Sequence, residues 1–304
     1  MTVLTVTPKD KQHWLDMKAK DISSTEASSL FGANPYCTLF ELWHRKKSGE
    51  IQELEPNERM TWGTRLEAAI AAGIAEDNNL IINSLKDYMT IPELRMGSSF
   101  DFSVGDDGLL EIKNVDSLMF RDGWIENEDG TVEGPAHIEI QVQHQMFISG
   151  RKFALIGALV GGNKVQLIRR ERDEEVIDAI KVETAKFWKS IDENIEPAPD
   201  FAKDHDMIRK LHNYAEPGTI VDITINEKLT QLAHEYKRLG EEMKLLDSSR
   251  DAIKSEMLIG LGEAEKAIGN GFTVSLGTTT VGEKVVKGYS FRQFRINWPR
   301  GRKE

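Results

Sequence analysis

The stretch SSFDFSVGDDGLLEIK, residues 98–113, predicts two strands joined by a tight turn. A Gly-Asp-Asp-Gly run at Gly105–Gly108, flanked by apolar residues, is a strong turn signal. The pattern favours extended chain from Tyr88 to Phe102 and a strand from Leu109 to Lys113. We therefore expect a hairpin that brings Asp101 back beside Glu111.

The second strand of this hairpin has two unlike faces. Glu111 and Lys113 point to one face, and Leu110 and Ile112 point to the other. Together with Asp101, the polar face collects two carboxylates and an ammonium group. Oxygen ligands suit a hard cation such as Mg²⁺, which lowers the pKa of a bound water and stabilises charge on a phosphoryl oxygen. The pattern indicates metal-assisted phosphodiester hydrolysis, and a surface ion pair is the alternative.

Two predicted helices carry polar residues that could complete this site. Glu67 lies on a helix expected over residues 58–78. The helix expected over residues 136–149 carries Gln141, Gln143, His144 and Gln145 in an otherwise apolar stretch, and an amide binds water or phosphate without adding charge. Both could instead be solvated helix positions. The order of elements, in which a helix is followed by a hairpin and then by another helix, predicts an α/β (α+β) nuclease core with a mixed central sheet flanked by helices.

Composition narrows the class of protein. With 304 residues, 39% hydrophobic and 29% charged, the chain is typical of a globular protein with one large or two smaller domains. No run approaches the roughly 20 apolar residues of a membrane helix, and the first residues lack a signal-peptide pattern. The single cysteine, Cys37, excludes a disulfide framework within one chain and suggests a reducing cytoplasm.

The net charge of −11 first argues against a nucleic-acid partner. The acidity is local, however, because residues 51–150 alone carry −13 and contain Glu67, Asp101 and Glu111. A bound metal would neutralise the central carboxylates, so an acidic balance does not exclude DNA. It predicts weak DNA binding in the absence of a divalent cation.

The last third of the chain differs in pattern. The run Glu196–Pro199 marks a boundary, so we expect a nuclease domain over residues 1–200 and an extension over 201–304. Residues 226–268 show apolar positions spaced alternately by three and four, as in a long helix packed on its own domain, a helical hairpin or a coiled coil. The tail from Gly282 carries +5 with interleaved aromatic residues, which suits either DNA contact or an ordinary amphipathic strand in a β-hairpin tail.

Five short segments between about residues 10 and 200 stand in a recognisable order. They are Lys18-x-x-x-Ile22-Ser23-Ser24-Thr25, Trp62-Gly63-x-x-x-Glu67, Ser99-Phe100-Asp101, Leu110-Glu111-Ile112-Lys113 and Gln141-Val142-Gln143. Together they resemble the motifs of the PD-(D/E)XK nuclease superfamily and, within it, of the YqaJ family of phage-type recombinases, to which lambda exonuclease belongs. Phe100 stands in place of the family's proline. Lys18 stands in place of an arginine, which loses bidentate phosphate binding.

This resemblance implies a role for each matching residue. Asp101 and Glu111 would ligate Mg²⁺ with the carbonyl of Ile112, and Lys113 would be the catalytic lysine. Glu67, as a further ligand, and Gln143 would position the metal or the water. The residues implied in binding DNA or its 5′-phosphate are Lys18, Ser24, Thr25, Ser99 and Gln141.

The activity implied is that of a Mg²⁺-dependent deoxyribonuclease, with Mn²⁺ expected to substitute. It would degrade double-stranded DNA ends 5′ to 3′ and leave 3′ single strands for a phage single-strand annealing protein. The family also implies a ring-type homo-oligomer, a trimer or larger, in the cytoplasm of a bacterial host. The alternatives are an endonuclease or a nuclease of opposite polarity on the same fold, or a non-catalytic DNA-binding or assembly protein.

Overall fold

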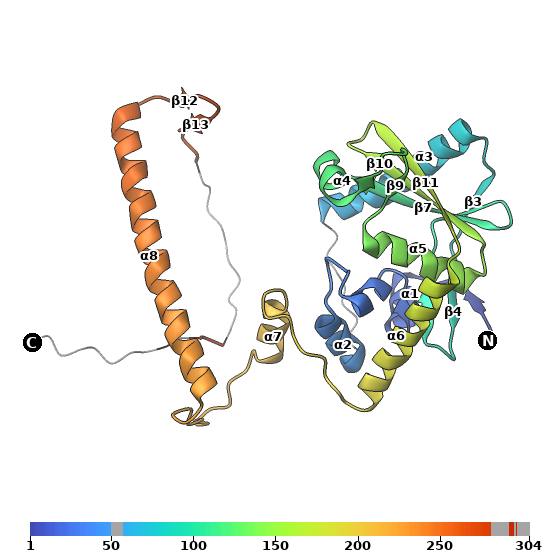
Figure 1. The fold of residues 1–304 in the computed structure, drawn as a ribbon, viewed down its shortest axis with the longest axis horizontal. Helices are drawn as coiled ribbons and strands as arrows, with labels where there is room; N and C mark the ends of the chain where they lie inside the picture. Colours follow the sequence, from blue (N-terminus) through green and yellow to red (C-terminus); the bar gives the residue numbers. More distant parts are fainter. Residues whose placement is uncertain (50–56, 281–291, 295, 297–304) are drawn as a thin grey trace, which may run out of the picture. The chain divides into compact units, whose positions relative to one another are not determined.

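The computed structural model describes residues 1–49, 57–280, 292–294 and 296. It divides into two units, Met1–Ile208 and Arg209–Glu304, close to the boundary expected at residue 200. Figure 1 shows both units. Within the described ranges, no helix has the length and apolar character needed to cross a membrane.

A five-stranded sheet forms the centre of the first unit, in the order β11-β10-β7-β6-β3. Its strands are β3 (Ile82–Ser84), β6 (Phe102–Val104), β7 (Gly108–Val115), β10 (Phe153–Val160) and β11 (Lys164–Glu171). β7 pairs with β10 in parallel, and the β6–β7 and β10–β11 pairs are antiparallel. The sheet is therefore mixed, and the predicted α/β fold class is confirmed.

Two helices cover opposite faces of this sheet. α3 (Glu58–Asn78) packs on one face, where β7 presents Leu110 and Ile112. α5 (Ala136–Ser149) packs on the other, where β7 presents Leu109. α3 approaches β10 closely, because a Cβ on Gly157 would lie 2.4 Å from the Cδ1 of Ile74. The alternation of side chains along β7 thus buries both of its faces.

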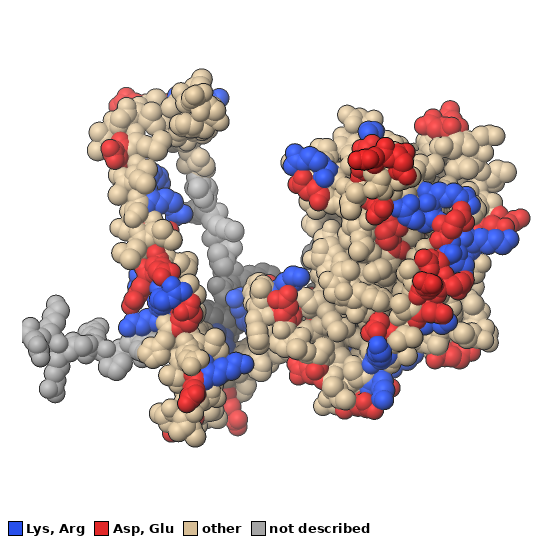
Figure 2. Space-filling view, viewed as in Figure 1, with Lys and Arg blue, Asp and Glu red and all other residues tan. Residues whose placement is uncertain are grey.

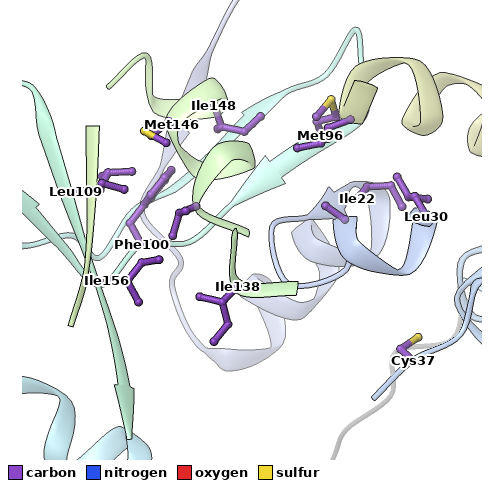
Figure 3. Packing of buried hydrophobic residues seen from close by; sticks show 14 of the residues in the cluster. Ile22, Leu30, Cys37, Met96, Phe100, Leu109, Ile138, Met146, Ile148 and Ile156 are labelled. Atoms are coloured by element: carbon purple, nitrogen blue, oxygen red, sulfur yellow. The ribbon is translucent and has the colours of Figure 1, made fainter. Parts of the chain in front are cut away.

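A smaller sheet lies on the far side of α5, in the order β1-β4-β5-β2. Its strands are β1 (Leu4–Val6), β2 (Ile22–Ser23), β4 (Tyr88–Ile91) and β5 (Met96–Ser98). α5 contacts β10 of the larger sheet and β4 and β5 of the smaller one, so this helix lies between the two sheets (Figure 1). Its buried residues, among them Ile138, Met146 and Ile148, join both sheets in one core (Figure 3).

The first unit contains further helical segments. Among them are α1 (Lys11–Lys20), the 3-10 helix η1 (Ala27–Phe31), α2 (Leu39–Ser48) and α6 (Glu174–Asp192). α6 and η1 pack on α5 and on each other. Each of α1, α2 and α6 begins at a side-chain cap, as when Thr38 accepts from the N–H of Glu41 at 3.0 Å. These caps explain why the helices begin where they do.

The structure differs from the sequence prediction in two segments of this unit. The run Ser23-Ser24-Thr25-Glu26 has the sequence pattern of a helix start, but β2 and η1 occupy this region, because Ser23 pairs with Gly97 in a parallel ladder. The polar composition of residues 123–135 favours a loop, but this segment contains a short hairpin of β8 (Ile125–Glu126) and β9 (Val132–Glu133), and α4 (Ser117–Gly123) precedes it.

The second unit contains one long helix, α8 (Glu227–Leu261), and the hairpin of β12 (Lys266–Ile268) and β13 (Thr273–Ser275). The short α7 (His205–Leu211) precedes them. α8 ends at Gly262, earlier than expected, because the chain turns there into the hairpin. None of its residues is buried, and acidic and basic side chains alternate along it (Figure 2). Most of the basic tail expected after Gly282 lies outside the described residues.

Candidate active site

The β6–β7 hairpin places Asp101 opposite Glu111. Phe102 pairs with Leu110 in the antiparallel ladder, so the residue before Phe102 lies across from the residue after Leu110. Asp101 Oδ2 accepts a hydrogen bond from the N–H of Ile112 at 2.8 Å, which holds the carboxylate against β7. The predicted approach of Asp101 to Glu111 is confirmed.

Glu111 is buried and accepts hydrogen bonds from three side chains. Lys113 Nζ and Gln141 Nε2 donate to Oε1, the latter at 2.6 Å, and Gln145 Nε2 donates to Oε2 at 2.7 Å. Lys113 Nζ also donates to Gln141 Oε1 at 3.2 Å. We call Asp101, Glu111, Lys113, Gln141 and Gln145 the β7 cluster. The four side chains joined by these hydrogen bonds fix one another's positions, as preorganised polar groups do.

Burial and the neighbouring negative charge of the β7 cluster disfavour the ionised forms of Asp101 and Glu67. Burial and the charge of Glu111 raise the pKa of Asp101 to about 8. Partial burial and the same charge raise the pKa of Glu67. For Lys113, burial alone would lower the pKa, but the charge and hydrogen bond of Glu111, together with the charges of Asp101 and Glu67, outweigh burial and raise it. Carboxyl groups that oppose one another's ionisation form a site that a cation would stabilise.

The donor atoms of this site suit Mg²⁺, which prefers oxygen and is often bound by only one or two carboxylates. Asp101 and Glu111 supply two. Glu67 lies within electrostatic range of both, but in the described part of the chain no three His, Cys, Asp or Glu residues are arranged to hold one metal ion. A two-carboxylate site therefore fits, and direct ligation by Glu67 or by the Ile112 carbonyl stays a prediction.

The structure does not bring Gln143 to the β7 cluster, so this part of the prediction is wrong in its geometry. Its Nε2 donates to the carbonyl of Glu171 at 2.9 Å, and its Oε1 accepts from the N–H of Asp173 at 2.9 Å. Gln143 thus ties the β11–α6 connection to α5. The sequence pattern singles out Gln145 with the other polar residues of this helix but assigns it no role in the site, although its spacing of four from Gln141 places both on one helix face.

The residues predicted to bind a 5′-phosphate lie near one another, because β2 and β5 are parallel neighbours and both strands end there. Lys18 Nζ donates to Thr25 Oγ1 at 3.3 Å, and burial lowers the pKa of Lys18. Ser99 is exposed and accepts from the Trp14 indole N–H at 2.8 Å. We call Lys18, Thr25 and Ser99 the Lys18 cluster.

Two residues of the predicted phosphate set are placed differently. Ser24 is buried, with its hydroxyl bonded to that of Ser98 at 3.0 Å, so it does not face solvent and supports the site from within the protein. Gln141 is also buried and belongs to the β7 cluster. Gln145 connects the two groups, since its Nε2 also lies 3.3 Å from the carbonyl of Ser99.

Comparisons with known proteins agree with this architecture. Residues 13–152 match the family described as the YqaJ-like viral recombinase domain. The chain is 26% identical over 268 residues to the uncharacterized protein YqaJ of Bacillus subtilis strain 168, covering 86% of this chain and 81% of that protein. The crystal structure of the alkaline exonuclease LHK-Exo from Laribacter hongkongensis has a TM-score of 0.50 and 21% identity, covering 66% of this chain and 98% of that one.

Proposed function

Because residues 13–152 match the YqaJ-like viral recombinase domain, we propose that the protein is a Mg²⁺-dependent deoxyribonuclease that degrades double-stranded DNA from its ends. The observation that carries this proposal is the placement of Asp101 opposite Glu111 with Lys113 on the same strand face. The similarity of fold to a protein named an alkaline exonuclease supports it.

The residues of the β7 cluster would divide the chemistry between them. Asp101 and Glu111 would hold Mg²⁺, which when bound supplies Lewis acidity to a water and to a phosphoryl oxygen. Lys113 can donate from Nζ to the attacking water or to the phosphate and so offset the negative charge that develops on it. Gln141 and Gln145 hold the Glu111 carboxylate in one orientation, the role that supporting hydrogen bonds have around metal ligands.

We also propose that the Lys18 cluster binds the 5′-phosphate of the DNA end, which would give the enzyme 5′ to 3′ polarity. Lys18 supplies positive charge, and Thr25 and Ser99 supply hydroxyl donors. Arg45 and Lys46 add to this charge, and both pair with the buried Glu26. Digestion in this direction leaves 3′ single strands, the substrate of a phage single-strand annealing protein in the bacterial cytoplasm.

Assembly of the protein as a homo-oligomer is a further proposal. A solitary 35-residue helix such as α8 gains little stability unless an apolar face is covered. α8 leaves Leu229, Leu232, Tyr236, Leu239, Met243 and Leu246 exposed along one stripe with heptad spacing. A second copy of the same helix would cover this stripe as a coiled coil.

The proposed activity is tested with linear duplexes carrying a label at either the 5′ or the 3′ end, with and without a 5′-phosphate. We expect Mg²⁺-dependent loss of mononucleotides from the 5′ end, faster when the phosphate is present, and no cleavage of closed circular DNA. Cleavage of the circle would assign an endonuclease, and release from the 3′ end would assign the opposite polarity. Binding without hydrolysis would leave a DNA-binding protein.

A further inference from the structure

Tyr36 lies in the loop between η1 and α2 with 79% of its surface exposed. Its ring meets the ring of His137 edge to face, with centroids 6.0 Å apart and planes at 88°. His137 is half-buried at the start of α5, so the exposed Tyr36 ring is in contact with a ring that the protein holds in a partly buried position. An aromatic ring supported on one side and open on the other can act as a stacking surface.

The His137 end of this pair adjoins the β7 cluster. His137, Gln141 and Gln145 follow one another at intervals of four along α5, so they share one face of the helix. Gln141, one turn from His137, is bonded to both Glu111 and Lys113. The charge of Lys113, after burial, also contributes to lowering the pKa of His137. The pair is therefore close to the catalytic lysine.

The loop that carries Tyr36 is also hydrogen-bonded to the Lys18 cluster. Asn34 Oδ1 accepts from the N–H of Tyr36 at 2.9 Å, and Asn34 Nδ2 donates to the carbonyl of Thr25 at 3.0 Å. On the other side of the loop, Ser29 donates to the carbonyl of Cys37 at 2.8 Å. These bonds hold the loop in one conformation, so the ring is presented without a large ordering cost.

We propose that Tyr36, backed by His137, is the stacking platform for the nucleobase of the DNA's 5′-terminal nucleotide. This inference rests on the proposed function. In a terminal nucleotide, the base projects from the sugar that joins the 5′-phosphate to the scissile phosphate. Tyr36 is linked to the groups assigned to both phosphates, so its exposed face is placed to meet that base. Stacking requires no particular base, which suits an enzyme that digests any sequence.

The test uses a 5′-phosphorylated duplex with 2-aminopurine as its 5′-terminal base, because the fluorescence of 2-aminopurine falls when it stacks. The protein carries Lys113→Ala so that the end is bound and not digested. We expect quenching with Tyr36 and with Tyr36→Phe, which keeps the ring. Tyr36→Ala should remove the quenching and weaken binding about tenfold. Tyr214, 72% exposed in the second unit, provides a matched control, and Tyr214→Ala should change neither signal.

The outcomes separate this inference from the proposed function. Unchanged quenching and affinity in Tyr36→Ala would overturn the platform even if the wild-type protein digests DNA. Quenching that depends on Tyr36, in a wild-type protein that hydrolyses no DNA, would support the platform and overturn the nuclease. A protein that binds no duplex end would overturn both. Because Tyr36 is exposed, its replacement should leave the melting temperature within about 1 °C, which excludes unfolding as the cause.

Discussion

Gln145 donates its side-chain N–H to Glu111 Oε2 at 2.7 Å, and so connects α5 to β7, the strand that carries Glu111 and Lys113. The next glutamine towards the helix start, Gln143, points elsewhere and bonds backbone atoms of the β11–α6 connection. Two glutamines separated by one residue therefore have different roles, because two positions along a helix turn the side chain by about 200°.

The two glutamines give a matched pair of variants. We expect Gln145→Ala to lower the rate of DNA digestion 10- to 100-fold, the usual effect of losing a group that orients a metal ligand. Gln143→Ala should keep the rate and lower the melting temperature by a few degrees, because it leaves partly buried backbone groups without their hydrogen-bond partner. Steady-state digestion and thermal unfolding of both proteins check this. Equal rate losses in the two variants would contradict the assignment.

A divalent cation should stabilise the folded protein through the Asp101–Glu111 pair. Saturation at about 100 times the dissociation constant contributes about 2.7 kcal/mol, which raises the melting temperature by several degrees. Asp101→Asn should lose most of this increase and fold normally, because the amide oxygen can still accept from Ile112. Asp106→Ala, in the exposed turn of the same hairpin, is the control. An undiminished increase in Asp101→Asn would rule out ligation by Asp101.

Glu26 should make stability depend on acid. Burial alone would raise the pKa of its carboxyl, but the charges of Lys46 and Lys18 and the bond from Ser23 outweigh burial and lower it to about 2. Because this pKa is lower in the folded state than in the unfolded state, the stabilisation is complete above about pH 5 and is lost as the pH falls towards 2.

This effect is measured against Glu26→Gln. The difference in unfolding free energy between wild type and variant should narrow by up to about 3 kcal/mol between pH 5 and pH 2. Urea unfolding at pH 6.5, 5, 4, 3 and 2 gives the comparison. A difference that stays constant over this range would mean that the ionised Glu26 carboxylate does not stabilise the fold.

The apolar stripe of α8 should set the oligomeric state. Leu239→Glu and Met243→Glu place charges in the stripe, so we expect a smaller particle by light scattering and lower helix content. Lys244→Ala changes the adjacent position outside the stripe and should leave the mass unchanged. An oligomer of unaltered mass in Leu239→Glu and Met243→Glu would show that the copies associate through another surface.

Local signals were sufficient for the catalytic hairpin and insufficient for contacts between distant elements. Gly105–Gly108 fixes the turn and hence the register of Asp101 against Glu111. The direction of Gln143 could not be predicted in the same way, because it depends on which face of α5 packs against β7. The burial of Ser24 and the loss of the helix expected at Ser23–Glu26 have one cause, since both depend on a parallel pairing with β5 more than 70 residues away.

The most direct test of the β7 cluster as the active site is Mg²⁺-dependent digestion of a linear duplex by Lys113→Ala compared with wild type. We expect loss of detectable digestion in the variant, at least a thousandfold, because the only ammonium group in the β7 cluster is removed. Its thermal unfolding should resemble that of wild type, since Gln141 and Gln145 still hold Glu111. Digestion of linear DNA by Lys113→Ala at the wild-type rate would contradict the assignment of the β7 cluster as the active site.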